Sequence, residues 1–401
     1  MSGESPETSV FASRAARVTL VMSAMFGTAG VILVFLPRWF EVERHLGGAE
    51  IGAILSLAQF ARIVTGLAIA HWADGVADRR TPLRLVSLAA VIAYAAFFTF
   101  AHDFVSLLVL GFIALSLTQT MTPLLEAALL RATAQGRISY GFGRGAGSVV
   151  FIIANVAGGA LIARFGLGAV VVWVIAGLVA TTGSAWLALK PDPPLQRSPH
   201  AHIGAGVGAL LKSQRFVVLL IACGLIQSAH AFYYSFSVLV WRGQGLSPDL
   251  IGWLWAFGGM VEVAFLWNLP AVERRVTPEA LILIGAGGGA LRWLCMGFGP
   301  TGFALWPLQA LHVSSFACAH VGAMRLLFRE APEASQATAQ TLYAATSAGM
   351  LMGASTLLSG FLYDRVGAGG YWAMSAMAFA GGALAILLIA PRSRAPGATS
   401  R

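Results

Sequence analysis

The sequence is poor in charged residues. Asp, Glu, Lys and Arg together make up 11% of its 401 residues, whereas 57% of the residues are hydrophobic. A soluble domain carries about 25% charged residues, so this chain has too few of them to cover its surface in water. The shortage argues against a soluble domain and indicates that a lipid bilayer is the solvent of the folded chain.

Motifs for metals, disulfides and nucleotides are missing as well. The three cysteines, Cys223, Cys295 and Cys318, lie in apolar stretches and form no CxxC pair, so neither a disulfide framework nor a zinc site is indicated. No GxxxxGK[ST] motif occurs, so the glycine clusters are not phosphate loops. The histidines of the apolar stretches have no acid beside them in sequence, which argues against a membrane-bound acyltransferase. We expect no enzyme activity, no cofactor and no metal.

What the chain does contain is long apolar runs, each of about the 20 residues that a membrane helix needs. The runs cover approximately 18–36, 50–71, 83–101, 104–130, 145–163, 167–189, 214–240, 250–270, 279–298, 301–325, 338–362 and 370–390. The first run is longer than the apolar part of a signal peptide, so we expect no cleavable signal. The sequence predicts an all-α membrane protein with twelve transmembrane helices.

A proline-rich polar stretch separates the sixth apolar run from the seventh, and it is the longest polar stretch in the chain. It divides the predicted helices into two six-helix halves. We expect the following segments: a tail 1–17, a first half 18–189, a linker 190–213, a second half 214–390 and a tail 391–401.

The basic residues favour one orientation in the membrane. With both termini in the cytoplasm, nineteen of the 26 Lys and Arg residues lie in cytoplasmic segments and five in outer segments. These residues are spread over many short loops, so the net charge of +9 does not indicate a nucleic-acid partner. We expect a multi-pass monomer in the lipid bilayer of a bacterial inner membrane, with both termini cytoplasmic.

The two halves echo each other at one joint. Asp78 to Pro82 follows the second run and Glu273 to Pro278 follows the eighth, and each segment holds an acid, two arginines and a proline. Six-span parallel repeats of this kind build one transporter architecture, in which the substrate site lies between the halves near the middle of the membrane.

The loop Trp72 to Arg80 resembles the acidic–basic loop between the second and third helices of the major facilitator superfamily, and the resemblance covers almost the whole chain. It implies the major facilitator fold. In the superfamily an arginine usually follows the first aspartate of this loop, whereas Gly75 follows Asp74 here. Asp74 and Asp78 are therefore both candidates for the acidic residue of the loop. We expect a gating loop that latches the cytoplasmic face, although positive-inside anchoring accounts for part of its arginines. The gating residues are Asp74, Asp78, Arg79 and Arg80.

A narrower resemblance is to lactose-permease-like proton symporters. It rests on Glu126, on the FGR segment that ends at Arg144, and on Glu262, Arg292 and His312. Those symporters place a proton-carrying acid three residues after the histidine, where this chain has Ser315, so another residue must carry the proton. The segments 309–320, 339–343 and 360–367 are more similar to the phenylpropionate permease-like family.

Ionisable residues at bilayer depth are functional candidates because an isolated charge there is costly. Glu262 lies in an apolar run, where burial favours the neutral carboxyl and suits a proton carrier. Arg292 could approach it and favour the ionised form, although a static pair that only joins helices is the alternative. Gln309, His312 and His320 fall along one side of the tenth helix, and a histidine can carry a proton near neutral pH. The predicted proton-coupling residues are Glu262, Arg292, His312 and His320.

A second set of polar residues is predicted to contact the solute. A buried arginine such as Arg62 suits a carboxylate, because its guanidinium binds one through two hydrogen bonds. Trp253, Trp255, Phe257 and Trp293 offer rings for stacking, which favours an aromatic acid. The set is Arg62, Glu126, Arg144, Gln309, His230 and Gln340, and packing between helices is the alternative for His230 and for the Glu126–Arg144 pair.

These patterns lead to one function hypothesis. We expect proton-coupled symport that imports a small organic solute, an aromatic or other carboxylate, by alternating access. A nucleoside or sugar symporter and a proton-driven exporter of drugs or metabolites are the alternatives. Exporters of the superfamily usually carry a glycine–proline signature in the fifth helix, whereas Asn155 to Gly159 has the glycines but no proline.

Overall fold

In the computed structural model of the chain, the regular secondary structure of the described residues is entirely helical. The described residues are 13–76, 78, 80–133, 139–190 and 206–389. The predicted tail 391–401 and most of the predicted linker 190–213 lie outside this part of the chain. The end of the linker contains a short helix, α7 (Val207–Lys212).

Six helices make up a first bundle. They are α1 (Arg14–Glu43), α2 (Gly48–Gly75), α3 (Arg80–Phe100), α4 (Phe104–Thr133), α5 (Tyr140–Phe165) and α6 (Gly168–Leu187). Within this bundle α1 packs against α4, α5 and α6, and α3 packs against α4 and α6. Each helix extends over one of the first six apolar runs of the sequence.

The second bundle is built from more segments, because several of its helices are interrupted. Its α-helices are α8 (Gln214–Ser228), α9 (Ala231–Gly243), α10 (Pro248–Trp267), α11 (Leu269–Glu273), α12 (Pro278–Gly297), α13 (Leu305–Ala310), α14 (Ala319–Glu330), α15 (Gln336–Ala344), α16 (Met352–Val366) and α17 (Gly370–Ile386). Two wide π-helical segments, η3 (Val313–Cys318) and η5 (Ala345–Leu351), join α13 to α14 and α15 to α16. Three short 3₁₀ turns complete it: η2 (Gly302–Ala304), η4 (Glu333–Ser335) and η6 (Gly367–Gly369).

Local sequence fixes where these helices begin and end. The hydroxyls of Ser13, Ser139 and Thr277 each accept a hydrogen bond from a backbone N–H in the first turn of the following helix. Pro278 occupies the first turn of α12, where a missing N–H costs nothing. Gly166 ends α5 with φ at +76°, a conformation that favours glycine.

The helices are long and apolar enough to cross a membrane. Ten stretches of the described residues meet that description. One of them, Gln336–Ile386, has 51 residues, which at about 1.5 Å per residue is more than twice the ~30 Å of a hydrocarbon core. It turns back at η6 and therefore holds two crossings. With α2 added, the described segments fit the predicted twelve.

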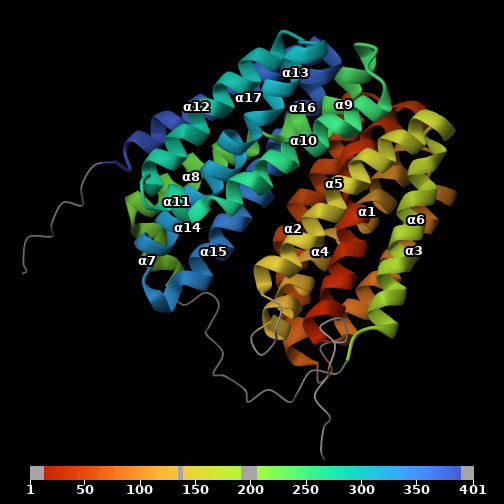
Figure 1. Cartoon of the computed structure of the whole chain (residues 1–401), viewed down its shortest axis with the longest axis horizontal. Helices are drawn as coiled ribbons and strands as arrows, with labels where there is room; N and C mark the ends of the chain where they lie inside the picture. Colours follow the sequence, from red (N-terminus) through yellow and green to blue (C-terminus); the bar gives the residue numbers. More distant parts are fainter. Residues whose placement is uncertain (1–12, 77, 79, 134–138, 191–205, 390–401) are drawn as a thin grey trace, which may run out of the picture.

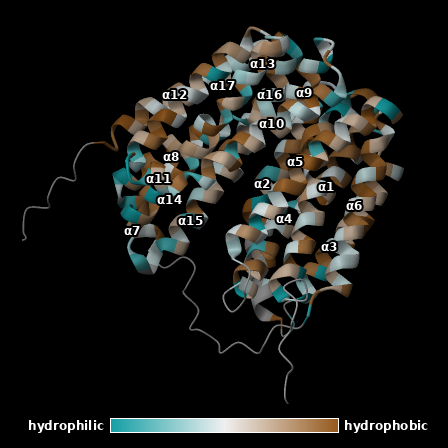
Figure 2. Ribbon diagram, in the orientation of Figure 1, coloured by the Kyte–Doolittle hydropathy of each residue, from teal (hydrophilic) through white to brown (hydrophobic). Residues whose placement is uncertain are grey.

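The two bundles meet at the end of the molecule where α1 ends and α2 begins, which we call the joined end. Contacts between the bundles pair α2 with α16 and η5, α5 with α10, and α1 with α9. Figure 1 shows the bundles converging at this end and diverging toward the opposite end, where α7, α14 and α15 lie. Figure 2 shows mostly hydrophobic residues along the lateral faces of both bundles, as expected for surfaces in contact with lipid.

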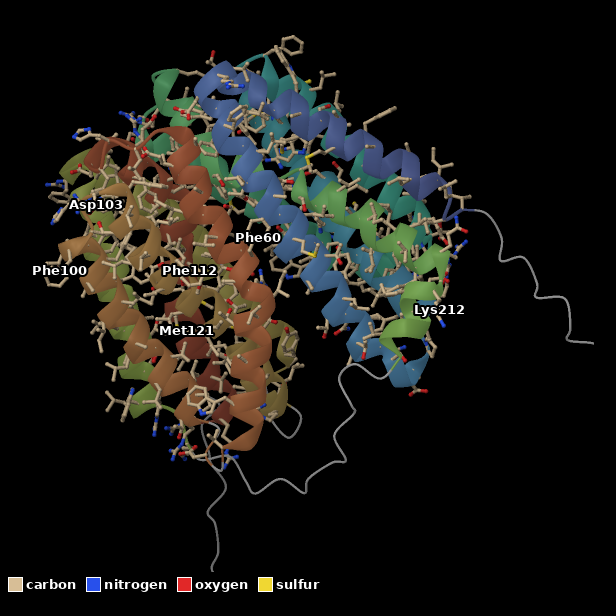
Figure 3. The ribbon with its side chains drawn as sticks, turned by 180° about the vertical axis from the view of Figure 1, so that it is seen from behind. Phe60, Phe100, Asp103, Phe112, Met121 and Lys212 are labelled. Carbon is tan, nitrogen blue, oxygen red and sulfur yellow. The ribbon has the colours of Figure 1, made fainter. Side chains whose placement is uncertain are left out.

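Glycines allow the close approach at the joined end. A Cβ atom at Gly52 of α2 would lie 3.0 Å from the Cα atom of Gly360 in α16. Gly353 similarly lies against the ring of Phe60, which Figure 3 shows between the two bundles. Gly252 of α10 lies against the backbone of Asn155 in α5. Small residues let helix backbones pack closely in a bilayer, where apolar surface alone gives no drive to associate.

Charged and polar groups close the joined end further. The Asp364 carboxylate of α16 accepts hydrogen bonds from the backbone N–H groups of Gly48, at 2.6 Å, and Ala49, at 2.8 Å. These are free N–H groups at the positive end of α2, so the second bundle caps a helix of the first. The Tyr363 hydroxyl donates to the Glu41 carboxylate of α1 over 2.9 Å.

Removal of the Asp364 charge is expected to loosen the joined end. The Asp364→Asn variant should raise the ratio of separated to joined molecules about fivefold, because a charged helix cap is worth about 1 kcal/mol. Electron–electron resonance between spin labels at the exposed positions 102 and 303 measures that ratio. Asp103→Asn is the matched control, since Asp103 caps α4 within its own bundle. An equal shift in both variants would contradict the assigned role of Asp364.

Candidate functional site

Three ionisable residues of the second bundle form a hydrogen-bonded chain that we call the relay. An Arg292 Nη1 of α12 lies 3.1 Å from His312 Nδ1, and His312 Nε2 lies 3.2 Å from a Glu262 carboxylate oxygen of α10. A guanidinium only donates, so Nδ1 must accept. The proton of a neutral imidazole then sits on Nε2, which donates to Glu262. With Glu262 in its ionised form, the relay then consists of a cationic Arg292, a neutral His312 and an anionic carboxylate.

Arg292 is the most enclosed member of the relay. Its second terminal nitrogen donates to the Gln309 amide oxygen at 2.9 Å, and Nη1 also reaches the Ser315 hydroxyl at 3.3 Å. The guanidinium lies over the rings of Tyr233, at 4.6 Å, and Trp293, at 4.5 Å. Such cation–π contacts partly replace the water that a buried cation has lost.

The relay runs from the interior to an accessible edge. Arg292 and Gln309 are fully buried, at 0% exposure. The His312 side chain keeps 13% of its surface exposed and the Glu262 side chain keeps 26%. Among the described residues no carboxylate lies within ion-pair distance of Arg292, so its charge is balanced by Glu262 only through the neutral His312. Solvent or a ligand can therefore reach the acid end of the relay but not the cation.

Several donors around Arg292 have no partner among the described residues. Arg292 Nε, Gln309 Nε2 and Trp293 Nε1 are buried and make no hydrogen bond there. The same holds for the Trp255 indole nitrogen and the Tyr371 hydroxyl. Buried donors are usually paired, so the region offers hydrogen bonds to an acceptor that the described residues do not supply.

His230 lies behind the relay. Its Nδ1 lies 3.0 Å from the Gln227 carbonyl and its Nε2 lies 3.2 Å from the Ser315 hydroxyl, and the residue is fully buried. The predicted contact between His230 and a solute is therefore not made in this conformation. His230 orients Ser315, which is in turn a partner of Arg292.

A wide helical turn places the relay histidine. His312 immediately precedes the π-helical η3, which contains Ser315. In the predicted stripe of the tenth helix, the rings of His312 and Phe316 stack at 5.2 Å and those of Phe316 and His320 at 6.0 Å. Gln309 turns inward to Arg292, whereas His320 is exposed. π-helical turns often occur at functional sites, where they change the direction of a side chain.

The predicted polar residues of the first bundle form a separate charged cluster. Arg144 Nε lies 3.4 Å from the Glu126 carboxylate, and both side chains are about one third exposed. Arg144 also donates to the Ser148 hydroxyl and lies over the ring of Phe26. Arg62 of α2 interacts electrostatically with Glu126, and part of its surface is accessible to solvent in this conformation.

The relay and this cluster flank the zone in which the bundles touch. Ile63, next to Arg62, contacts Gly349 of η5, and Ile152 of α5 contacts Gly259, three residues before Glu262. Gln340 is exposed on α15 and takes no part in either group of residues.

In the predicted gating loop, the described residues bond within the first bundle. Arg80 donates to both oxygens of the Asp78 carboxylate and to the Leu189 carbonyl near the end of α6. The hydrogen bonds from Arg80 lower the pKa of Asp78, so this pair stays ionised at a lower pH than a free aspartate allows. Arg79 and the side chain of Asp74 lie outside the described residues.

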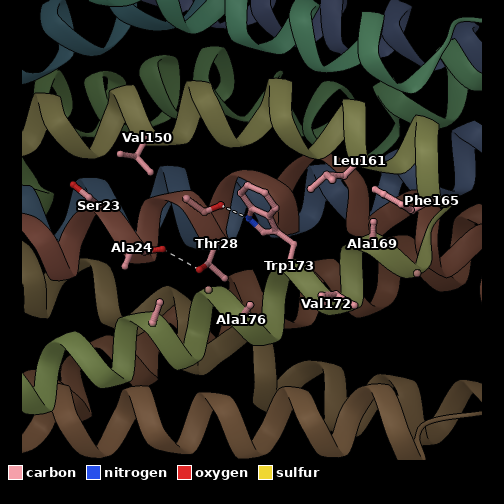
Figure 4. Close-up of a pocket in the computed structure, with 14 residues that line it drawn as sticks. Ser23, Ala24, Thr28, Val150, Leu161, Phe165, Ala169, Val172, Trp173 and Ala176 are labelled. Atoms are coloured by element: carbon pink, nitrogen blue, oxygen red, sulfur yellow. Dashed lines mark hydrogen bonds between the residues drawn. The ribbon is translucent and has the colours of Figure 1, made fainter.

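A groove of about 820 Å³ lies elsewhere, between α1, α5 and α6 (Figure 4). Its walls include Val150, Leu161 and Val172, and its indole, Trp173, donates to the Gly27 carbonyl at 3.0 Å. The polar side chains in its lining are two hydroxyls, those of Ser23 and Thr28. This lining lacks the charged groups that recognition of a small ionised solute requires, so the groove is not the candidate site.

Sequence reasoning missed two partners of the relay. Ser315 was noted only as the absence of an expected acid, and Tyr233 was assigned no role. Tyr233 donates to the Gln309 amide oxygen over 2.8 Å and stacks on Trp255 at 4.5 Å. The signal was a row of polar side chains at helical spacing in an apolar run, but the sequence does not show which helices face each other. The carboxylate that His312 lacks in sequence is supplied by α10 through tertiary contact.

Two helical bundles joined at one end, with ionised residues buried at bilayer depth, define a membrane transporter of the major facilitator class. The chain belongs to the MFS_1 like family, which matches residues 17–374. The predicted superfamily and fold class are thereby confirmed, and the chain is a transporter rather than an enzyme.

Relatives extend over most of the chain. The "Probable 3-phenylpropionic acid transporter" of Escherichia coli (strain K12) is 30% identical over 350 residues, which cover 86% of this chain and 91% of that protein. The "Maltose permease" of Geobacillus stearothermophilus is 27% identical, with coverage of 93% and 94%. The crystal structure of the nucleoside transporter NupG superposes with a TM-score of 0.75 at 17% identity, covering 94% of this chain and 98% of that one. That likeness concerns the fold alone.

The relay makes a stability prediction. The His312→Ala variant leaves Arg292 buried without a link to its counter-charge, so the free energy of unfolding should fall by about 3 kcal/mol. Addition of Arg292→Met should recover part of that loss, because it removes the uncompensated charge. Unfolding of the purified protein in mixed detergent micelles measures both. His320→Ala is the matched control on the same helix and should change stability by less than about 0.5 kcal/mol. Equal losses for the two histidine variants would contradict the relay.

Proposed function

We propose that this transporter imports a small organic carboxylate together with a proton, by alternating access between its two bundles. The single observation that carries the proposal is the relay of Arg292, His312 and Glu262. Its acid end is accessible and its cation is buried, so a proton can enter at Glu262 and change the charge balance around Arg292.

The relay has the chemistry of a proton carrier. A carboxyl and an imidazole joined by one hydrogen bond can pass a proton between them. An ionisable group at this depth is costly unless it has a function or a partner. Glu262 also lies one helical turn from Gly259, where α10 touches α5, so relative movement of the bundles would change its surroundings. That link between protonation and conformation is what coupled transport requires.

The orientation follows from the arginines. The end opposite the joined end carries Arg17, Arg80, Arg84 and Arg215, which donate to the last carbonyls of α6 or to Leu388 beyond α17. The positive-inside rule assigns this end to the cytoplasm. The described conformation is then inward-facing, with both termini on the cytoplasmic side of the inner membrane. The loop that contains Asp78 and Arg80 would gate this side when the bundles close there.

A carboxylate is the favoured solute because arginines serve both sides of the site. Arg62 and Arg144 belong to the first bundle and Arg292 to the second. Trp255, Trp293 and Tyr233 surround Arg292 with aromatic faces that suit an aryl group. The relative with 30% identity, whose name specifies 3-phenylpropionic acid, supports the same class.

Proton movement in liposomes tests the proposal. The purified protein is reconstituted in vesicles that contain a pH-sensitive dye, and inward gradients of 3-phenylpropionate, other aromatic acids, nucleosides and maltose are imposed in turn. Internal acidification should follow an aromatic acid and disappear in Glu262→Gln, which cannot release a proton. Glu43→Gln, an exposed residue at the end of α1, is the control and should retain the signal.

Two results would sink the hypothesis. One is solute uptake without any proton signal, unchanged by Glu262→Gln, which would leave a facilitator with a structural glutamate. The other is alkalinisation inside the vesicles as solute enters, which would indicate exchange against protons, as in an exporter.

A further inference from the structure

Arg292 presents an unusual charge problem. It is fully buried, yet its three nearest polar partners, His312, Gln309 and Ser315, are all neutral in the described geometry. A buried cation without a direct counter-ion is costly, and removal of His312, which links it to Glu262, would increase that free-energy cost. The protein therefore holds a guanidinium in place at a cost that its own residues do not fully offset.

We propose that Arg292 is the anchor for the carboxylate group of the transported solute, and that His312 covers this anchor until the relay takes up a proton. The proposal rests on the proposed symport function and deepens it by assigning the solute's charge to one residue. It replaces Arg62 in that role, because Arg62 already interacts with the Glu126 carboxylate, whereas Arg292 has no carboxylate within ion-pair distance among the described residues.

The first step is a count of charge. Arg292 carries +1 and Glu262 −1, so the relay is neutral as described. One added proton, whether it resides on Glu262 or on His312, leaves the relay at +1. A single carboxylate restores neutrality, so proton and carboxylate favour each other's binding by the same factor. One proton and one monocarboxylate would then enter together with no net charge.

The second step is access. In the described geometry His312 Nδ1 accepts from Arg292, which requires a lone pair on that nitrogen. A proton on Nδ1 would turn the acceptor into a donor that faces another donor, and two positive charges would then repel. His312 immediately precedes the π-helical η3, where a change of helical register can move the ring aside. Movement of the His312 ring away from Arg292 would open a path to the guanidinium from the exposed edge at Glu262.

The third step is the shape of the exposed anchor. Arg292 Nη1 would be freed by His312, and Arg292 Nε and Gln309 Nε2 have no partner among the described residues. The freed Nη1 can donate to a carboxylate, whose oxygens only accept, and the two other unpaired donors make the same region favourable to an anion. The nearby faces of Trp293 and Tyr233 would then lie beside the aryl or alkyl part of the solute.

Other ionisable groups around the relay do not supply the missing anion. The titratable neighbours in the second bundle are His230, Tyr233, Tyr234, His320 and Tyr371. From the first bundle, α5 packs on α10 and contributes Arg144, which is paired with Glu126. No second carboxylate of the described residues joins Glu262 in this set.

Binding to the purified full-length protein tests the anchor. Titration calorimetry at pH 5.5, 6.5 and 7.5 compares benzoate, 3-phenylpropionate and hexanoate with 3-phenylpropanamide, a neutral isostere. At least one acid should bind. Its affinity should fall by up to about tenfold for each unit by which the pH rises, as expected for uptake of one proton. The amide should bind at least about tenfold more weakly than its acid, because it offers no charge to the guanidinium.

Variants separate the anchor from a general loss of structure. Gln309→Glu places a carboxylate on Arg292, so the folded protein should lose acid binding at least about tenfold while its thermal midpoint is maintained or raised. Arg292→Gln should lose acid binding as well, and Arg242→Gln, an arginine that donates only to the Leu246 carbonyl, should not. Glu262→Gln should bind the acid with little dependence on pH.

Several outcomes would overturn the anchor. The anchor fails if the acid and the amide bind equally, or if Gln309→Glu binds the acid as tightly as the wild type does. It also fails if chloride alone gives the same binding signal as the acids, or if none of the three acids binds at pH 5.5. The vesicle assay on the same variants keeps the two proposals apart. If acid-driven acidification requires Glu262 but survives Gln309→Glu, symport stands and the anchor fails. If the wild type shows no proton signal with any solute, the proposed function itself fails.

Discussion

The charge of Arg292 is the constraint on which the site depends. A guanidinium at 0% exposure in a bilayer protein needs a counter-charge. Glu262 supplies it indirectly, because His312 lies between the two side chains. Aromatic faces and the Gln309 amide complete the shell. An indirect counter-charge can be altered by one proton, whereas a direct and fully buried ion pair would resist it. The arrangement that lowers the stability of the fold therefore also allows one proton to change the charge balance at Arg292.

The joined end provides the mechanical half of that response. Glycines of α2 and α16 bring two backbones together, and the Asp364 carboxylate caps the start of α2 from the other bundle. These contacts are short-range and weak one by one, so a modest free energy can separate them. The relay lies just beyond the α5–α10 contact, within the same second bundle that carries Asp364. A change of charge at the relay and a change of packing at the joined end can thus both affect the position of the second bundle.

Much of this fold could be predicted from the sequence. The apolar runs gave the helices, because twenty apolar residues in a bilayer have few alternatives to a helix. Charged residues inside those runs marked Glu262, Arg292 and Glu126, because such residues are rare and costly there. Glu126 and Arg144 lie within ion-pair distance of each other, which is compatible both with a substrate site and with the alternative of a joint between helices.

The arrangement of the site could not be predicted in the same way. The sequence suggested that Arg292 could approach Glu262, but in the structure His312 lies between them. Helical spacing put His312 and His320 on one side, yet only His312 joins the relay and His320 is exposed. Each difference depends on which helices pack together and on local helix geometry, and a single sequence records neither.

The most direct test of charge balance at Arg292 is the net charge moved per solute. Current is recorded from the reconstituted protein on a solid-supported membrane while an aromatic acid and an acid pH are applied from one side, and proton uptake is followed in parallel with an internal dye. One proton for each monocarboxylate predicts clear acidification with no sustained current and no effect of membrane potential on uptake. A sustained inward positive current in proportion to uptake would contradict it, because protons would then enter without a carboxylate to neutralise them.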